Sequence, residues 1–187
     1  MNRTALYAEH LKRGAKMTDF HGWEMPLYYT SILEEHACVR SRVGLFDISH
    51  MGQVLGSGPG ALPTLNALVV SDLEQVGEGR ACYTLLMNGQ GRIVDDLIVY
   101  RLTPQDYLII VNCANRTKDV EWLRAHQQGQ ATIRDLSVGR SILAIQGPKS
   151  ADLLEDVLET NVRSLGRFSV MALPPLQVRR SRRRCGA

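Results

Sequence analysis

The chain has 187 residues, of which 44% are hydrophobic and 22% are charged, a balance typical of a folded globular protein rather than a disordered one. This length suits one domain with room for two lobes. No run approaches the about 18 apolar residues that a membrane-spanning helix needs, and the first residues lack the apolar core of a secretory signal, so we expect a cytoplasmic protein that does not bind membranes.

The formal charge of +3 is unevenly distributed along the chain. Five of the 22 basic residues lie in residues 169–187, which contain no acidic residue, so the rest of the chain has 17 basic and 19 acidic residues and a charge of −2. A nucleic-acid-binding protein normally carries its basic patch on the folded body. The distribution therefore disfavours binding to nucleic acid.

Two helices are predicted near the N-terminus. Residues 5–16 have helical spacing and include Gly14 as the end of the helix. In residues 31–44, Ser31 can cap a second helix, and Glu34 follows three positions later. The apolar face of this second helix would consist largely of four residues: Ile32, Cys38, Val39 and Val43.

Four runs rich in Val, Ile, Leu and Tyr predict strands, at residues 52–58, 81–88, 92–103 and 106–113. The loop "MNGQGR" between the second and third runs predicts a hairpin. Pro104 lies between the third and fourth runs, so the pattern favours an antiparallel meander. A helix is predicted next, in "NRTKDVEWLRAHQQ".

Two parts of the chain share one sequence pattern, which we call the internal echo. The stretches "VLGSGPGALPTLNALV" and "LAIQGPKSADLLEDVL" each predict a strand, a Gly-Pro turn and an amphipathic helix, with Gly58 and Gly147 at the turns. Antiparallel strands mixed with helices indicate the α+β class. We therefore predict antiparallel sheets with flanking helices in two similar lobes.

Asp95 and Asp96 interrupt an apolar strand, "IVDDLIVY". Strand alternation sends one carboxylate to each face, so one of them must point toward buried side chains. A buried carboxylate is costly unless it has a partner or a ligand. The pattern leaves two interpretations open, a functional carboxylate or an aspartate bonded to backbone N–H groups at a strand end or bulge.

Other residues of catalytic types have poorer spacing. Asp47, Ser49 and His50 in "LFDISHMG" are the residue types of hydrolytic triads, but triad members normally converge from separated segments, so we expect structural hydrogen bonds. The histidines lack HExxH spacing and the four cysteines lack CxxC spacing. We therefore expect no metal site, and thiols that stay reduced.

Five stretches together resemble the T-protein family, the folate-dependent aminomethyltransferases of the glycine cleavage system. They are "GAKMTDFHGWEMPLYYTS", "EEHACVRSRVGLFDISHMGQV", "ACYTLLMNGQGRIVDDLIVYRL", "LIIVNCANRTKDVEWL" and "LAIQGPK". The resemblance runs nearly without gaps from Leu6 to about Phe168, which would be the N-terminal half of the family's chain. It implies a three-lobed α+β fold around a tetrahydrofolate in a central hole.

The resemblance also implies a reaction. T-proteins take the aminomethyl group from the lipoyl arm of H-protein and transfer its one-carbon unit to tetrahydrofolate as methylenetetrahydrofolate. Ammonia and reduced lipoyl H-protein are released. Such a transfer needs a carboxylate that orients the folate and favours a cationic carbon. An alternative is a non-catalytic folate-binding module, because some relatives of this fold are of that kind.

Four residues match functional positions of the family. The carboxylate of the reaction, the second aspartate of the "DDL" motif, falls on Asp96, which favours a functional role there. The pocket asparagine falls on Asn112. The tyrosine of "YTLL" falls on Tyr83 and the methionine of "SHMG" on Met51, and both would line the folate pocket. Asp95, on the other face of the strand, would matter much less.

The resemblance stops at about residue 168. The family continues with strands that lead to a Gly-Tyr-Thr-Gly-Glu motif, whereas this chain continues with "SVMALPPLQVRRSRRRCGA". We therefore expect residues 1–168 to be an incomplete folate-binding region and residues 169–187 an arginine-rich tail, which a truncation or frameshift explains better than a genuine basic appendage. Such a chain would be inactive by itself and marginally stable, since a sheet edge and apolar surface stay uncovered.

Overall fold

The structure, a computed structural model, describes residues 1–173 and 176–180. These residues belong to two units. Unit 1 comprises residues 1–50 and 140–164, and unit 2 comprises residues 51–139 together with the described part of 165–182. Each unit has its own sheets and helices.

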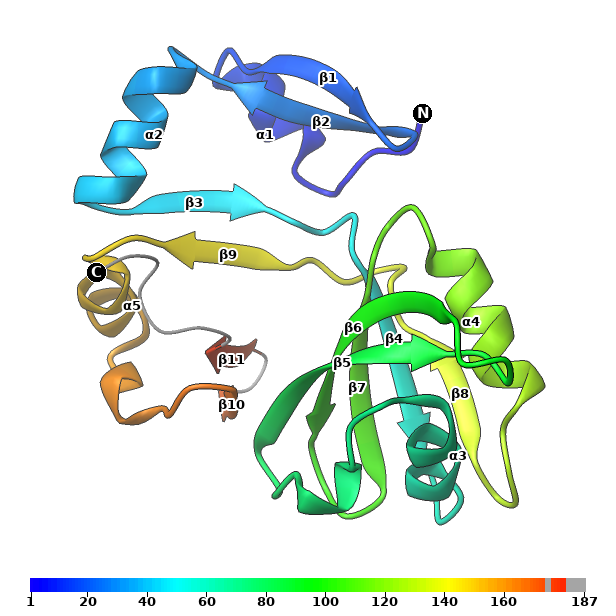
Figure 1. The fold of residues 1–187 in the computed structure, drawn as a ribbon. Coiled ribbons are helices and arrows are strands. Elements are labelled where there is room, and N and C mark those ends of the chain that lie inside the picture. Colours follow the sequence, from blue (N-terminus) through cyan, green and yellow to red (C-terminus); the bar gives the residue numbers. More distant parts are fainter. Residues whose placement is uncertain (174–175, 181–187) are drawn as a thin grey trace. The chain divides into compact units, whose positions relative to one another are not determined.

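Unit 1 contains two small antiparallel sheets and three α-helices (Figure 1). Its elements are α1 (Tyr7–Lys12), β1 (Lys16–Phe20), β2 (Trp23–Tyr28), α2 (Ile32–Ser41), β3 (Gly44–Asp47), β9 (Leu143–Gln146), α5 (Ser150–Leu158) and the 3₁₀ turn η2 (Val162–Ser164). β1 pairs with β2, and β3 pairs with β9, from far along the chain.

The two predicted N-terminal helices are both present, with two differences. α1 ends at Lys12 and the chain already enters β1 at Lys16, because Gly14 adopts φ +75° and reverses the backbone between them. Ser31 caps α2 as predicted, accepting a hydrogen bond from the backbone N–H of Glu34. Val43, assigned to the apolar face of this helix, lies beyond its end at Ser41, and α2 has no buried residue, with Ile32 56% exposed. The sequence pattern shows which side of a helix can pack, not whether the described residues cover it.

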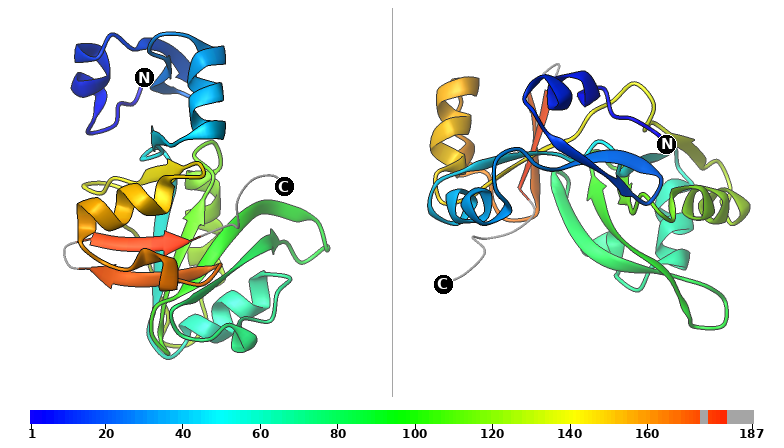
Figure 2. Two further views of the ribbon diagram at one scale, coloured as in Figure 1. Left: turned by 90° about the vertical axis from the view of Figure 1, so that its left-hand side faces the viewer. Right: turned by 90° about the horizontal axis from the view of Figure 1, so that it is seen from above.

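Unit 2 is built on a seven-stranded antiparallel sheet of order β11-β10-β5-β6-β7-β4-β8 (Figures 1 and 2). Its elements are β4 (Gly52–Ser57), α3 (Ala61–Leu68), the 3₁₀ turn η1 (Leu73–Gln75), β5 (Arg80–Met87), β6 (Ile93–Arg101), β7 (Asp106–Val111), α4 (Arg116–Ala125), β8 (Thr132–Asp135), β10 (Ser169–Leu173) and β11 (Leu176–Arg180). The four predicted strands and the predicted hairpin loop between β5 and β6 are confirmed. Asn88 fixes that loop by accepting from the backbone N–H groups of Gln90 and Arg92 at 3.0 Å.

The two faces of this sheet have different environments. α3 and α4 lie over one face, which we call the helix-covered face (Figure 1). Its core joins side chains of both helices to alternate residues of β4, β6 and β7: Leu65, Leu68, Val120, Leu123, Val54, Leu97, Val99, Ile109 and Val111. The opposite face, which we call the open face, carries a small cluster of Ala81, Tyr100 and Leu108, with Phe168 and Val170 packed against it.

The internal echo predicted from the sequence is present in the order of elements. β4 leads through Gly58 into α3, and β9 leads through Gly147 into α5. Both glycines have positive φ, +93° and +122°. A Cβ on Gly147 would lie 2.5 Å from the carbonyl oxygen of Arg42, and one on Gly58 would overlap the carbonyl oxygen of Gln130. Only glycine fits either turn without displacing backbone.

These observations confirm the predicted α+β class, with antiparallel sheets and flanking helices. The segment predicted as a tail begins where β10 begins. Ser169 pairs with Arg80 of β5, and the N–H of Val170 donates to the carbonyl of Gly79. Among the described residues, no helix has the length and apolar character needed to cross a bilayer.

Candidate functional site on the open face of the unit 2 sheet

Strand β6 directs its two aspartates to opposite faces of the sheet, as alternation predicts. Asp95 is 7% exposed and shares the helix-covered face with Leu97 and Val99. Asp96 is half-buried on the open face. It therefore has solvent on one side and hydrogen-bond donors on the other.

Two neutral donors hold the Asp96 carboxylate. The Tyr83 hydroxyl donates to Oδ2 at 3.0 Å, and the Asn112 side-chain nitrogen donates to Oδ1 at 3.1 Å. The register pairs Leu85 with Asp96, so Tyr83 lies diagonally across β5, within reach of a long aromatic side chain. Because neither donor carries a charge, they orient the carboxylate without neutralising it.

Asn112 owes its position to a very short connection between β7 and α4. It directly follows the last residue of β7, and α4 begins at Arg116. Its side-chain nitrogen lies 3.1 Å from three oxygens: Oδ1 of Asp95, Oδ1 of Asp96 and the backbone carbonyl of Asp96. With acceptors on every side, this end of the amide must be the N–H₂ group.

Met51, the fourth residue assigned by resemblance, is half-buried and precedes β4. The register pairs Gly52 with Val111, so its continuation places Met51 beside Asn112. The structure thus joins Asp96, Asn112 and Tyr83 by hydrogen bonds, and it places Met51 next to them by strand register alone.

Two further polar residues at this point were missed by sequence reasoning, Asn115 and Asp119. Asn115 precedes α4 at the N-cap position, yet its side chain makes no cap hydrogen bond and instead donates to Oδ1 of Asp95 at 2.9 Å. Asp119, one turn further along, is fully buried and contacts the Asp95 carboxyl. The signal was available, because residues 119, 120 and 123 lie on one side of a helix whose apolar members are buried.

Burial and hydrogen bonding move the pKa values of these two carboxyls in opposite directions. Burial alone would raise the pKa of Asp95, but hydrogen bonds from Asp119, Asn112 and Asn115 outweigh it and hold the pKa below its ordinary value. Burial, reinforced by the hydrogen bond and charge of Asp95, raises the pKa of Asp119 to about 8. The two groups therefore favour one shared proton at neutral pH.

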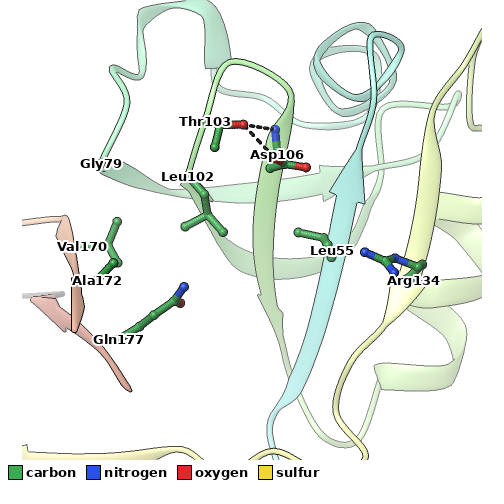
Figure 3. A pocket seen from close by; sticks show the side chains of 9 residues that line it. All are labelled: Leu55, Gly79, Leu102, Thr103, Asp106, Arg134, Val170, Ala172 and Gln177. Atoms are coloured by element: carbon green, nitrogen blue, oxygen red, sulfur yellow. Dashed lines mark hydrogen bonds between the residues drawn. The ribbon is translucent and has the colours of Figure 1, made fainter. Parts of the chain in front are cut away.

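A cavity of about 580 Å³ lies on the same open face, within unit 2 (Figure 3). Leu55 pairs with Leu108, which pairs with Tyr100, so strand alternation connects the cavity to the face that carries Asp96. Figure 3 shows Leu55 and Arg134 on one side of the cavity, and Val170, Ala172 and Gln177 of the β10–β11 hairpin on the other. Asp106 and Thr103, joined by a 2.8 Å hydrogen bond, complete a mixed polar and apolar lining.

The residues of "LFDISHMG" make structural hydrogen bonds, as predicted. Asp47 accepts from the backbone N–H of Ser49, and its other oxygen lies 3.0 Å from Nε2 of the buried His10. The Ser49 hydroxyl bonds both backbone groups of Ile142. His50 packs against the ring of Phe20. Within the described residues, no three His, Cys, Asp or Glu side chains are grouped to hold a metal ion.

Comparison with known proteins agrees with this fold. The family model described as "GCVT N-terminal domain" matches residues 6–185. Two curated relatives are both aminomethyltransferases. The protein of Thermotoga maritima is 41% identical over 170 residues, covering 90% of this chain and 47% of its own length, and that of Bacillus pumilus is 43% identical over 173 residues, covering 92% and 47%. The chain therefore spans about half the length of the curated relatives it matches.

A solved structure leads to the same assignment. The glycine cleavage system aminomethyltransferase T from Bartonella henselae superposes with a TM-score of 0.85 at 34% identity, over 90% of this chain and 46% of that one. The family match also extends across β10 and β11, into the segment for which the sequence predicted a tail. On the family match over nearly its whole length and on this agreement in fold, the chain belongs to the GCVT N-terminal domain family.

Proposed function

We propose that this chain forms a folate-binding part of an aminomethyltransferase of glycine degradation. The enzyme would transfer a one-carbon unit from the aminomethylated lipoyl arm of H-protein to tetrahydrofolate and release ammonia. The observation that carries this proposal is the Asp96 carboxylate, which Tyr83 and Asn112 hold on the open face of the sheet. The names of the relatives support the reaction class.

The chemistry explains why a fixed carboxylate is useful. The transferred carbon loses its bonds to the lipoyl sulfur and to the amino nitrogen and gains two bonds to folate nitrogens, and the two folate N–H protons leave with the thiol and the ammonia. Tetrahydrofolate supplies the two nucleophilic nitrogens. The carbon develops positive charge as its leaving group departs, and a preorganised anion stabilises that charge. The hydrogen bonds from Tyr83 and Asn112 hold Asp96 in the fixed position that such an anion needs.

The open face suits a planar heterocycle with N–H donors. Asp96 offers acceptor oxygens there, and Tyr83 beside it, which is 53% exposed, contributes an aromatic ring to the same face. Ile98 and Ile110 are half-buried on the same face and provide apolar contact area. The cavity on that face offers space for the remainder of an elongated ligand.

Calorimetry with tetrahydrofolate on the 187-residue chain tests the folate site. We expect saturable binding by the unmodified chain and at least a tenfold weaker affinity for Asp96→Asn, which retains shape and loses charge. Glu121→Gln is the matched control, since Glu121 lies exposed on α4, on the helix-covered side of the sheet. The control should bind as the unmodified chain does.

Ammonia release from aminomethylated H-protein then distinguishes the two functional hypotheses. Release that depends on both tetrahydrofolate and H-protein supports the aminomethyltransferase. Folate binding without release, in a chain joined to the part of its relatives that these 187 residues do not span, supports the non-catalytic folate-binding module instead. Absence of folate binding by the folded chain contradicts a folate site within these residues.

The proposal includes a boundary for the folate-binding region at residue 168. The hydrogen bonds that join Asp96 to Tyr83 and to Asn112 lie before this residue. β10 and β11 follow it, and their side chains reach the cavity but not the Asp96 hydrogen bonds. The arginine-rich residues 181–187 lie outside the described residues.

A further inference from the structure

The proposed reaction leaves one buried ionisable group unused, the Asp119 carboxyl. Asp119 is 0% exposed on α4, beneath the sheet face opposite to Asp96. Among the described residues, neither of its oxygens meets an N–H or hydroxyl donor, and Oδ2 of Asp95 is in the same situation. The group that Asp119 meets is the Asp95 carboxyl itself.

Two carboxyls form a hydrogen bond only when one of them carries a proton. Oδ1 of Asp95 already accepts from Asn112 at 3.1 Å and from Asn115 at 2.9 Å, and both bonds favour a charged Asp95. Asp119 has no comparable donors, so the proton resides on Asp119 and points to Oδ2 of Asp95.

The other charged groups around Asp119 do not replace the proton between Asp119 and Asp95. Lys118, on the same helix, directs its ammonium to the carbonyl oxygen of Val94 at 2.7 Å. On the β8 side of α4, Arg116 is paired with Asp135 at 2.7 Å. α3, which also packs against α4, has no ionisable residue in "ALPTLNAL". Asp96, on the other face of β6, adds negative charge.

We propose that Asp95 and Asp119 share a single proton and act as positioning residues, holding the Asn112 amide and through it the Asp96 carboxylate. This inference takes its functional meaning from the folate site proposed above. The charged Asp95 anchors Asn112 from below, and the same Asn112 nitrogen donates to Asp96 on the open face. Asn115 and Lys118 attach the start of α4 to β6 beside this pair.

The proton shared by Asp95 and Asp119 makes the position of Asn112 depend on pH. Burial beside Asp95 raises the pKa of Asp119 to about 8, so the shared proton is retained at neutral pH and lost in mildly alkaline solution. Its loss leaves two anions in contact inside the protein, which repel each other. The hydrogen bonds of Asn112 then loosen, and Asp96 loses one of its two donors.

NMR titration of the 187-residue chain from about pH 5.5 to about pH 9.5, a range that contains the raised pKa of Asp119, tests the inference without any ligand. We would follow the side-chain ¹⁵N–¹H₂ signals of Asn112, assigned by their disappearance in Asn112→Ala, together with ¹³C-carboxyl signals of the aspartates. We expect the Asn112 signals to shift with the same midpoint as the Asp119 carboxyl. In Asp119→Asn, whose amide imitates the protonated acid, the Asn112 signals should stay near their low-pH position throughout.

Two further variants, Glu121→Gln and Asp95→Asn, test the origin of the alkaline midpoint. Glu121→Gln, on the exposed side of α4, should reproduce the unmodified titration. Asp95→Asn lets an amide donate to a charged Asp119, so the alkaline midpoint should disappear there too. Asn112 signals that ignore the Asp119 midpoint, or an Asp119 that titrates below pH 5 as an ordinary aspartate would, overturn the proposal. Because no folate is present, failure of the folate proposal leaves this result unaffected.

Discussion

The side-chain nitrogen of Asn112 lies 3.1 Å from Oδ1 of Asp96 and equally 3.1 Å from Oδ1 of Asp95. One amide therefore connects a half-exposed carboxylate on the open face of the sheet to a buried one beneath α4. Replacing Asn112 removes a donor from both at once. Substitutions at Asp95, Asp96 and Asp119 individually separate the contributions of the carboxylates.

Asp96→Asn is expected to lower turnover by roughly two to three orders of magnitude, the scale of losing one preorganised electrostatic contact. The measurement is ammonia release from aminomethylated H-protein, with the chain joined to the part of its relatives that it does not span. Tyr83→Phe removes only one neutral donor from Asp96 and should cost about tenfold. Losses of equal size for Asp95→Asn and Asp96→Asn would show that the catalytic role has been given to the wrong aspartate.

The free energy of unfolding should fall as pH rises from about 4 to about 8, because of Asp119. Its pKa is about 8 in the folded chain against an ordinary value of 3.8, so the folded chain retains a proton that the unfolded chain releases in this window. The slope approaches, at most, about 1.4 kcal/mol per pH unit for one proton. The pKa of Asp95 is lowered, so its stabilisation is lost only at more acidic pH, as pH falls through that depressed value.

Urea unfolding at several pH values, for the unmodified chain and for Asp119→Asn, measures this slope. The variant cannot lose the proton and should show a flatter dependence across the window. Glu121→Gln serves as the control for removal of a single acid from α4. Parallel curves for the unmodified chain and Asp119→Asn would contradict the raised pKa.

Gly147→Ala should destabilise unit 1 by about 3 kcal/mol or more, since its φ of +122° is nearly restricted to glycine. The new Cβ would also meet the carbonyl oxygens of Arg42 at 2.5 Å and Val39 at 2.6 Å. Gly14→Ala is the matched control, because φ is also positive there, at +75°, but the surrounding space is open. The control should cost about 1 kcal/mol. Thermal unfolding compares the two, and similar losses would mean that the crowding at Gly147 relaxes readily.

Chains ending at 168, 180 and 187 test the proposed boundary of the folate-binding region. Cutting after 168 removes the Val170 N–H bond to Gly79, the contact of Ser169 with Arg80 and the packing of Val170. We expect the 1–168 chain still to unfold cooperatively, with a midpoint lower by several degrees, the effect of about 1 to 2 kcal/mol in a domain of this size. The chains ending at 180 and 187 should unfold alike. A 1–168 chain that no longer folds would show that the β10–β11 hairpin is an indispensable part of the structure.

Much of this fold could be predicted from local sequence. The β5, β6 and β7 strands follow from runs of Val, Ile and Leu, and Ser31 and Asn88 indicate a helix start and a hairpin by their own hydrogen bonds. The pairing of β3 with β9 could not be predicted, since residues about 100 positions apart in sequence meet there and each strand has only four residues. Short edge strands have too little pattern to be recognised alone.

The candidate site was predicted in part. Alternation correctly divided Asp95 from Asp96, and the resemblance selected Asn112 and Tyr83, which the structure brings into contact with Asp96. Asp119 was missed because an acidic residue in the first turn of a helix normally indicates exposure and a favourable helix dipole. The helical spacing of Asp119, Val120 and Leu123 indicates that they share one side of α4, and the short loop after β7 places the start of that helix against β6, which buries Asp119 beside Asp95.

Side chains of β6 alternate between the packed core and the open face, so substitutions along this strand should have two different kinds of effect. Substitutions at Leu97 and Val99 would disturb the packed core and so change how much folded protein a cell retains. Substitutions at Ile98, one position away but facing the other side, would alter the open face proposed to bind folate while leaving that core intact. A scan of every residue of β6, with abundance and ligand affinity scored separately, should show the two readouts alternating with a period of two. Such a result would mean that substitutions along one strand can change ligand affinity while the fold stays the same.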